Sequence, residues 1–149
     1  MRDGEITKSK CGEITLNFFM PMKKIPTTTH QQKQVHVVKG KPIFYEPNDL
    51  RQARMTLMDN LARFCPPKPI EGMVKLGVKW QFPLKNHEEN EYKTTKPDLD
   101  NLVKLLQDCM TQLGFWEDDR YVVSLHTEKT YNELSGIYIQ IEGDEDGLA

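Results

Sequence analysis

The segment from Lys96 to Asp119, KPDLDNLVKLLQDCMTQLGFWEDD, limits the possible folds of this chain more strongly than any other part of it. Its apolar residues recur at the three- and four-residue spacing of a helix that buries one face, at Leu99, Leu102, Val103, Leu106, Cys109, Met110 and Leu113. Asp98 stands where an N-cap carboxylate accepts an amide of the first turn, and Gly114 stands where a helix ends in left-handed backbone. The pattern predicts a helix of about four turns.

Charged side chains stand at both ends of this predicted helix, off its apolar stripe. Asp98 and Asp100 begin it, and Lys104 follows Asp100 on nearly the same face. Together with Asp119, the two acids predict a site for Mg²⁺ or Mn²⁺, because carboxylates that converge repel one another unless a cation neutralises them. Asp119 joins them only if the chain doubles back after the helix. The alternative is ordinary helix capping at one end and a solvated turn, Glu117–Asp119, at the other.

Length and composition predict one soluble domain spanning residues 1–149, with residues 1–12 and 143–149 flexible. The chain has 149 residues, 38% of them hydrophobic and 28% charged, with no run long enough to span a membrane. The N-terminus MRDGEITKSK lacks the apolar core of a secretory signal. Three cysteines without CxxC spacing (Cys11, Cys65 and Cys109) argue against disulfides or zinc, so we expect a cytoplasmic location.

The rest of the chain predicts short strands and one more helix. We expect a strand over 13–21, a hairpin over Gln34–Tyr45, a helix over Asn48–Phe64, and strands over Val74–Phe82, Tyr121–Thr127 and Ile137–Ile141. This order is neither alternating βα nor all-β. It predicts the α+β class, with two helices on one mixed sheet.

The charge of the chain is unevenly distributed around a net value of −2. No acid occurs between Met22 and Tyr45, where the positive residues are Lys23, Lys24, Lys33, Lys39 and Lys41. A long loop of this kind either grips a substrate or carries solvated lysines. The sequence contains no phosphate-binding glycine loop, nucleophile elbow or HExxH motif, and its four histidines form no pair at ligand spacing.

The pattern KPDLDNL with Lys104, followed by GFW and Asp118-Asp119, resembles the RusA family of Holliday junction resolvases. The closing GIYIQI resembles the last strand of that family. This combination is far rarer than a bare DxD, and the match is specific from about Tyr92 to Glu142. Upstream, the resemblance rests on the order of strands, basic loop and helix.

The resemblance implies a RusA-like homodimer that acts as a Mg²⁺-dependent endonuclease, with Mn²⁺ as a substitute. Its substrate would be a four-way DNA junction, nicked symmetrically in DNA recombination and repair. The metal-binding, catalytic aspartates would be Asp98, Asp100 and Asp119, since the spacing favours Asp119 over its neighbour Asp118, and Lys104 would be the catalytic lysine. Such genes are often carried by phages and prophages, so a bacterial or phage-encoded cytoplasmic protein is implied.

This chain departs from the family in its extra N-terminal residues and its slightly acidic charge. DNA binding would then depend on local positive charge, for which the candidates are Lys23, Lys24, Lys33, Lys39, Lys41, Lys93 and Lys96, with the Lys75/Lys79 strand face. Two alternatives stay open: a non-catalytic protein of the same fold that binds branched DNA, and a looser branched-DNA nuclease.

Overall fold

The computed structural model describes residues 5–8, 13–27, 34–38, 40–45 and 48–144, which form ten elements. In chain order these are β1 (Glu5–Lys8), β2 (Glu13–Pro21), β3 (Gln34–Val38), β4 (Lys41–Tyr45), α1 (Asn48–Ala62), β5 (Val74–Pro83), α2 (Leu99–Leu113), the 3₁₀ turn η2 (Asp119–Tyr121), β6 (Val122–Asn132) and β7 (Gly136–Asp144). The expected order of elements is confirmed, with β1 as an addition that the sequence did not predict.

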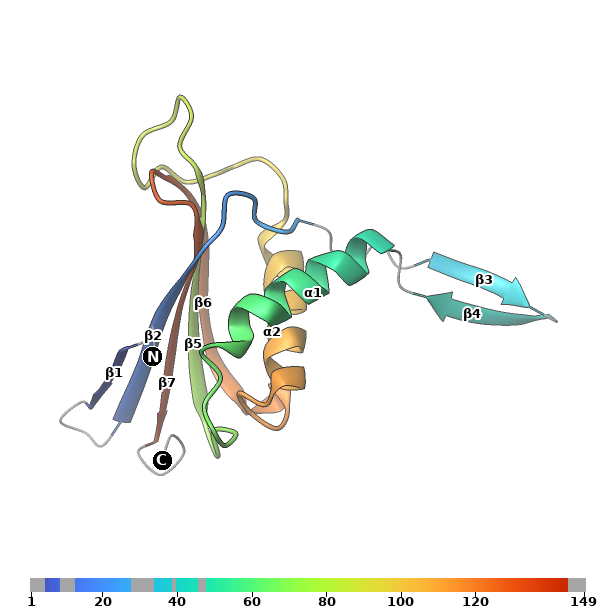
Figure 1. Cartoon of the computed structure of the whole chain (residues 1–149), viewed down its shortest axis with the longest axis horizontal. Coiled ribbons are helices and arrows are strands. Elements are labelled where there is room, and N and C mark those ends of the chain that lie inside the picture. The colour runs from blue at the N-terminus through green and yellow to red at the C-terminus, as the bar shows by residue number, and fades with distance from the viewer. Residues whose placement is uncertain (1–4, 9–12, 28–33, 39, 46–47, 145–149) are drawn as a thin grey trace.

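Five strands form one mixed sheet in the order β1-β2-β7-β5-β6. The β5–β6 pair is parallel, whereas the other pairs are antiparallel. Both helices cover the same face of this sheet (Figure 1). Helix α2 runs down this face toward the lower end of the sheet, where β6 starts. The predicted α+β class with two helices on one mixed sheet is confirmed.

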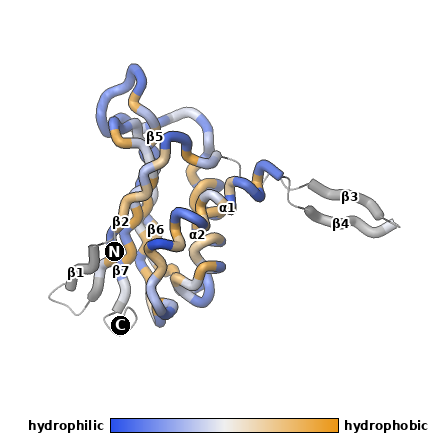
Figure 2. Tube along the Cα trace, in the orientation of Figure 1, coloured by the Kyte–Doolittle hydropathy of each residue, from blue (hydrophilic) through white to orange (hydrophobic). Residues whose placement is uncertain are grey.

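The alternation of apolar residues along the strands decides which face of the sheet is covered. Leu76, Val78 and Trp80 of β5 are buried toward the helices, and by register their neighbours on β7 are Ile141, Ile139 and Ile137. Figure 2 shows hydrophobic colour along the strands of the sheet and along the helices, and hydrophilic colour in the loop that leads from β5 to α2. Burial of this face anchors α2 and thereby orients its polar sides.

The helix α2 begins and ends where its sequence predicts. Gly114 takes the left-handed φ of 93°, and its amide donates to the carbonyls of Met110 and Thr111. Asp98 is the N-cap with extended backbone, but its side chain makes no capping hydrogen bond, so this detail of the prediction is wrong. The backbone carbonyl of Asp98 instead accepts from the Leu102 amide at 3.2 Å. The Asp98 carboxylate is therefore not used in closing the helix.

The predicted hairpin over Gln34–Tyr45 is confirmed, since β3 and β4 pair antiparallel as a separate two-stranded sheet. Gly40 has the positive φ of 75° in the turn. The hairpin stands away from the main sheet (Figure 1). Lys33 and Lys39 lie outside the described residues.

Two of the three cysteines lie in the described chain, and neither forms a disulfide there. Cys109 is buried on the apolar stripe of α2, and burial raises the pKa of Cys65. Cys11 lies outside the described residues. Among the helices that the structure describes, none is long and apolar enough to cross a membrane.

Leu106 of α2 has no exposed surface, so we expect Leu106→Ala to lower the free energy of unfolding by about 2–5 kcal/mol. The loss combines the transfer of the removed atoms and the cavity they leave. Gln112→Ala, at an exposed position on the same helix, should change stability by no more than about 0.5 kcal/mol. Urea unfolding of both variants tests this, and equal effects would show that α2 is not anchored by its apolar stripe.

Candidate metal centre

Two of the predicted acids lie together at the start of α2. Asp98 is the N-cap and Asp100 belongs to the first turn, and both are exposed. Lys104 follows one turn later, also exposed. Within the part of the chain that the structure describes, these three side chains make no hydrogen bond or ion pair with the protein. They are therefore free to meet a cation or a phosphate.

The third acid, Asp119, is fixed at the opposite end of the same helix. Its Oδ1 accepts hydrogen bonds from the hydroxyl of Thr111, in the last turn of α2, and from Trp116 Nε1 at 3.4 Å. Trp116 is fully buried, and its Nε1 also donates to the Thr111 hydroxyl at 2.7 Å. Because Oδ1 takes both bonds, Oδ2 is left unengaged by any described residue. Sequence reasoning missed this arrangement, although a buried indole N–H needs an acceptor nearby.

The length of α2 separates Asp119 from the other two acids. Thr111 lies about 16 Å beyond Asp100 along the helix axis, at 1.5 Å per residue. Accordingly, no three His, Cys, Asp or Glu side chains among the described residues lie where one metal ion could bind them. One chain therefore brings Asp98 and Asp100 together and holds Asp119 apart. The assignment of these residues to a metal site stays a prediction.

The neighbouring acid Asp118 has a different environment from Asp119. Its Oδ1 accepts the Arg120 amide at 2.9 Å and caps η2. The Arg120 guanidinium lies over the Tyr121 ring and donates to its hydroxyl at 3.2 Å, a contact that raises the pKa of Arg120. Asp118 thus closes a local turn, and its exclusion from the site stays a prediction.

A lysine that sequence reasoning did not select lies close to Asp98. Lys129 Nζ, on β6, donates to the carbonyls of Thr95 and Pro97 at 2.7 Å each. Burial lowers the pKa of Lys129, the charge of Lys93 lowers it further, and the charge of Asp98 acts in the opposite direction. No motif marks Lys129 in the sequence, because its role depends on a contact across more than thirty residues.

The predicted DNA-binding lysines that the structure describes differ in their surroundings. Lys23, Lys24 and Lys96 are exposed. Lys93 is half-buried, its Nζ 2.6 Å from the Thr95 hydroxyl and 5.2 Å from the centroids of two aromatic rings, Phe82 and Tyr131. The role of each in binding DNA stays a prediction.

The open face of the sheet is less basic than the sequence suggested. Lys75 lies opposite Glu142 on β7, Lys79 lies opposite Glu128 on β6, and Lys79 Nζ donates to Asn90 Oδ1 at 2.7 Å. Each of these lysines has an acidic neighbour on the adjacent strand. The face therefore offers no uniform positive surface to a polyanion.

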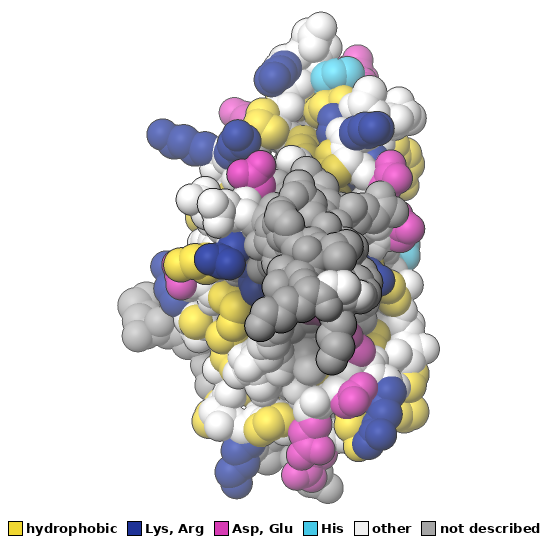
Figure 3. All heavy atoms as spheres, turned by 90° about the vertical axis from the view of Figure 1, so that its right-hand side faces the viewer, with side chains coloured by type: hydrophobic (Ala, Val, Ile, Leu, Met, Phe, Trp, Pro, Cys, Tyr) yellow, Lys and Arg dark blue, Asp and Glu magenta, His cyan; other side chains and the backbone are white. Residues whose placement is uncertain are grey.

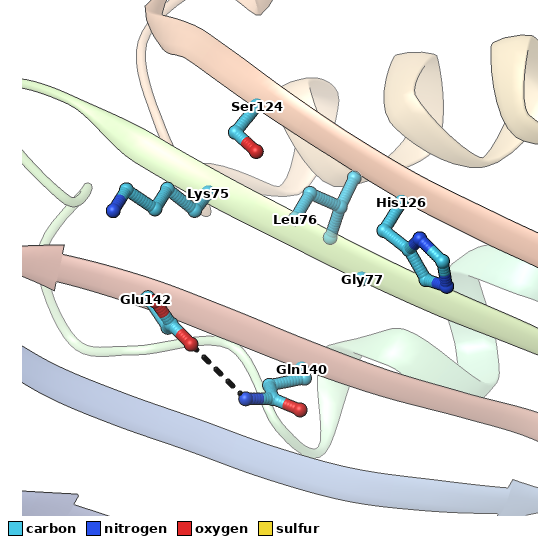
Figure 4. Close-up of a pocket in the computed structure, with 7 residues that line it drawn as sticks. All are labelled: Lys75, Leu76, Gly77, Ser124, His126, Gln140 and Glu142. Carbon is cyan, nitrogen blue, oxygen red and sulfur yellow. Dashed lines mark hydrogen bonds between the residues drawn. The ribbon is translucent and has the colours of Figure 1, made fainter.

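A shallow pocket on this open face contains Lys75 but none of the predicted metal-binding or catalytic residues (Figure 4). It is lined by Lys75, Leu76, Gly77, Ser124, His126, Gln140 and Glu142. Gly77 contributes no side chain between Gln140 and His126, which leaves the hollow. The helices lie on the other side of the sheet, so this pocket is remote from the acids of α2.

Comparison with known proteins identifies a protein family and individual proteins to which this chain is similar. The family model described as endodeoxyribonuclease RusA matches residues 21–142. The crossover junction endodeoxyribonuclease rusA of Lactococcus phage r1t is 37% identical over 131 residues, which cover 86% of this chain and 98% of that protein. The uncharacterized protein YqaN of Bacillus subtilis (strain 168) is 33% identical over 88 residues, covering 51% of this chain and 61% of YqaN.

The family match begins at the end of β2, spans both helices and the hairpin, and ends within β7, so it includes every predicted site residue. Together with the near full-length phage relative, it establishes that this chain belongs to the RusA family of endodeoxyribonucleases.

Proposed function

We propose that this chain is a Mg²⁺-dependent endonuclease that resolves Holliday junctions by paired, symmetric nicks, with Mn²⁺ as a substitute. The observation that carries the proposal is the start of α2, where two exposed acids and Lys104 stand on a helix anchored by a buried stripe. The phage r1t relative, named a crossover junction endodeoxyribonuclease, supplies the substrate class.

The chemistry of the donor set fits a hard divalent cation. Asp98 and Asp100 offer carboxylate oxygens that no described protein group occupies, and such oxygens are the preferred ligands of Mg²⁺. When bound, such a cation activates water and stabilises charge at a phosphate under attack. Lys104 would hold a fixed positive charge beside that phosphate.

A second copy of the chain would supply the missing third acid. Asp119 is held by Thr111, which lies about 16 Å beyond Asp100 along the helix axis, so one protomer alone presents two acids at one place and one at another. In a two-fold dimer with antiparallel α2 helices, Asp119 of the partner subunit would meet Asp98 and Asp100. The same operation would build a second, equivalent site. Two equivalent sites suit paired cuts in a symmetric junction.

The free edge of β6 is where we place the contact between the two copies. Residues 129–131 of β6 pair with residues 90–93, but Val122–Glu128 has no strand on its outer side among the described elements. Val123 is 57% exposed and Leu125 is 44% exposed. No Lys, Arg, Asp or Glu interrupts 122–127, although exposed edge strands are normally protected by charge.

Antiparallel pairing of two β6 edges would bring Asp119 of the partner subunit toward Asp98 and Asp100, as the proposed metal site requires. Centred on Leu125, it places Val122 opposite Glu128 of the partner subunit. The two-fold axis is then perpendicular to the sheet, so the helices of both copies lie on one face. Asp119 of the partner subunit then comes close to Lys129, whose ammonium contacts the residue before Asp98.

DNA would be held by the lysines that precede α1 and α2. The candidates are Lys23, Lys24, Lys33, Lys39, Lys41, Lys93 and Lys96. On the face toward which the hairpin projects, Lys and Arg side chains are frequent in the upper half, where acids also lie among them (Figure 3). The upper half includes the loop that leads into α2. Phosphate contacts of this kind weaken as salt rises.

The first experiment compares a labelled four-way junction with a linear duplex of the same sequence, with Mg²⁺ and with EDTA. We expect paired nicks on the junction only, abolished by EDTA. Junction binding without nicks in Mg²⁺ or Mn²⁺ would instead indicate a branched-DNA-binding protein. Equal cutting of the duplex would indicate a looser nuclease.

The shared site predicts complementation between two inactive variants. Asp100→Asn and Asp119→Asn should each abolish cleavage as homodimers and leave junction binding intact. When the two are co-expressed with different tags and purified as a mixed dimer, one complete site forms, so single nicks should return. If each site came from one chain, both sites of the mixed dimer would be damaged and no nicks would appear.

The proposed contact predicts that charges at the β6 edge separate the two copies. A Val123→Lys, Leu125→Lys double variant should be monomeric by light scattering and inactive, with an unchanged circular dichroism spectrum. Leu134→Lys is the matched control, because Leu134 is also apolar and 72% exposed but lies in the turn before β7. A double variant that stays dimeric would place the contact elsewhere.

A further inference from the structure

Residues 84–97 connect β5 to α2, and β6 holds this connection at two places. The first is the end of β6, where Asn132 Nδ2 donates to Glu89 at 2.6 Å and to Asn90 at 2.9 Å. The His87 ring also stacks on Tyr131 with centroids 3.6 Å apart. These contacts position the first half of the connection, before the residues that lead into the acids.

Lys129 makes the hydrogen bonds that hold the last part of the connection, residues 93–97. Its backbone carbonyl accepts the Lys93 amide at 3.0 Å, and its ammonium donates to the carbonyls of Thr95 and Pro97 at 2.7 Å. Within the described chain, these are all the hydrogen bonds that join residues 93–97 to another element. Pro97 directly precedes Asp98, and the negative charge of Asp98 acts to raise the pKa of Lys129 against the larger lowering by burial.

We propose that Lys129 is a positioning residue, which fixes the backbone of residues 95–97 and thereby the place of the Asp98 carboxylate at the start of α2. The inference rests on the proposed function, since it concerns a metal-binding acid. The Asp98 side chain makes no capping hydrogen bond, so helix formation by itself does not fix where this carboxylate lies. A compact ammonium has three donors and bonds both carbonyls at once.

The position of Lys129 also links Asp98 to β6, the strand that we assign to the dimer contact. Lys129 follows the free part of the β6 edge by one residue. By holding the residues before Asp98 against β6, Lys129 keeps this carboxylate in place relative to Asp119 of the partner subunit. Loss of the Lys129 hydrogen bonds would displace Asp98 without removing any metal ligand.

The test compares three variants by amide hydrogen exchange, which needs no metal and no substrate. Lys129→Met keeps the apolar stem and loses the ammonium. Lys129→Arg keeps the charge and loses the compact donor. Lys79→Met is the matched control, because Lys79 also lies on a strand, is half-buried and bonds the connection, at Asn90.

We expect Lys129→Met to accelerate exchange of the two hydrogen-bonded amides in this region, those of Lys93 and Leu102, at least about tenfold, because a hydrogen bond to a charged group is lost. The Leu102 amide, bonded to the Asp98 carbonyl, reports the near end of α2, and the Gly114 amide reports the far end. Gly114 should not change, and Lys79→Met should leave 93–102 as in the wild type. Unchanged exchange in Lys129→Met, or acceleration throughout the sheet, would overturn the proposal.

Cleavage supplies the second readout. Lys129→Met should slow junction cleavage by about tenfold or more, as expected for a group that orients a metal ligand, with junction binding in EDTA unchanged. Lys129→Arg should remain slow, and full activity in it would overturn the role of the compact donor. If the wild type fails to cut junctions, the proposed function fails, and hydrogen exchange still decides whether Lys129 positions Asp98.

Discussion

The burial of one side of α2 against the sheet governs how the functional residues of this molecule are arranged. Leu102, Leu106 and Met110 are almost completely buried, and they fix both the rotation and the direction of the helix. With that side fixed, Asp100 and Lys104 can only lie on an exposed side. The same direction sends the N-terminus of α2 to one end of β6 and its C-terminus to the other. The separation of the acids is therefore a consequence of core packing.

The separation of Asp119 from Asp98 and Asp100 bears on how a member of this family would bind a metal ion. A cation bound by acids from both ends of α2 would need a second copy of the chain, so an isolated protomer would hold an incomplete site. Because carboxylates brought together repel one another, a complete site is favourable only with the cation present. Assembly, metal binding and cutting would then be coupled, and a junction with two-fold symmetry is the substrate that suits two such sites.

Much of the fold could be predicted because its signals are local. The alternation along β5, the spacing along α2 and the left-handed residue Gly114 each involve neighbours within a few positions. Strand β1 was missed because EITK is short and carries charges at both ends, and its order depends on pairing with β2. The predicted Asp98 cap was wrong for a related reason: a suitable residue at the N-cap position does not determine where its side chain points.

The amino-acid order is enough to identify which residues are candidates for the chemistry, since DLDN with Lys104 and GFWEDD is typical of one family, and to show that they flank one helix. Where those residues lie relative to one another emerges only in the folded chain. Asp119 is bound to Thr111 and Trp116, away from Asp98, and Lys129 reaches the residue before Asp98 from a distant strand. The physical reason is that periodicity and capping act between residues close in the chain. The path of α2 across the sheet depends on contacts among residues from the whole chain.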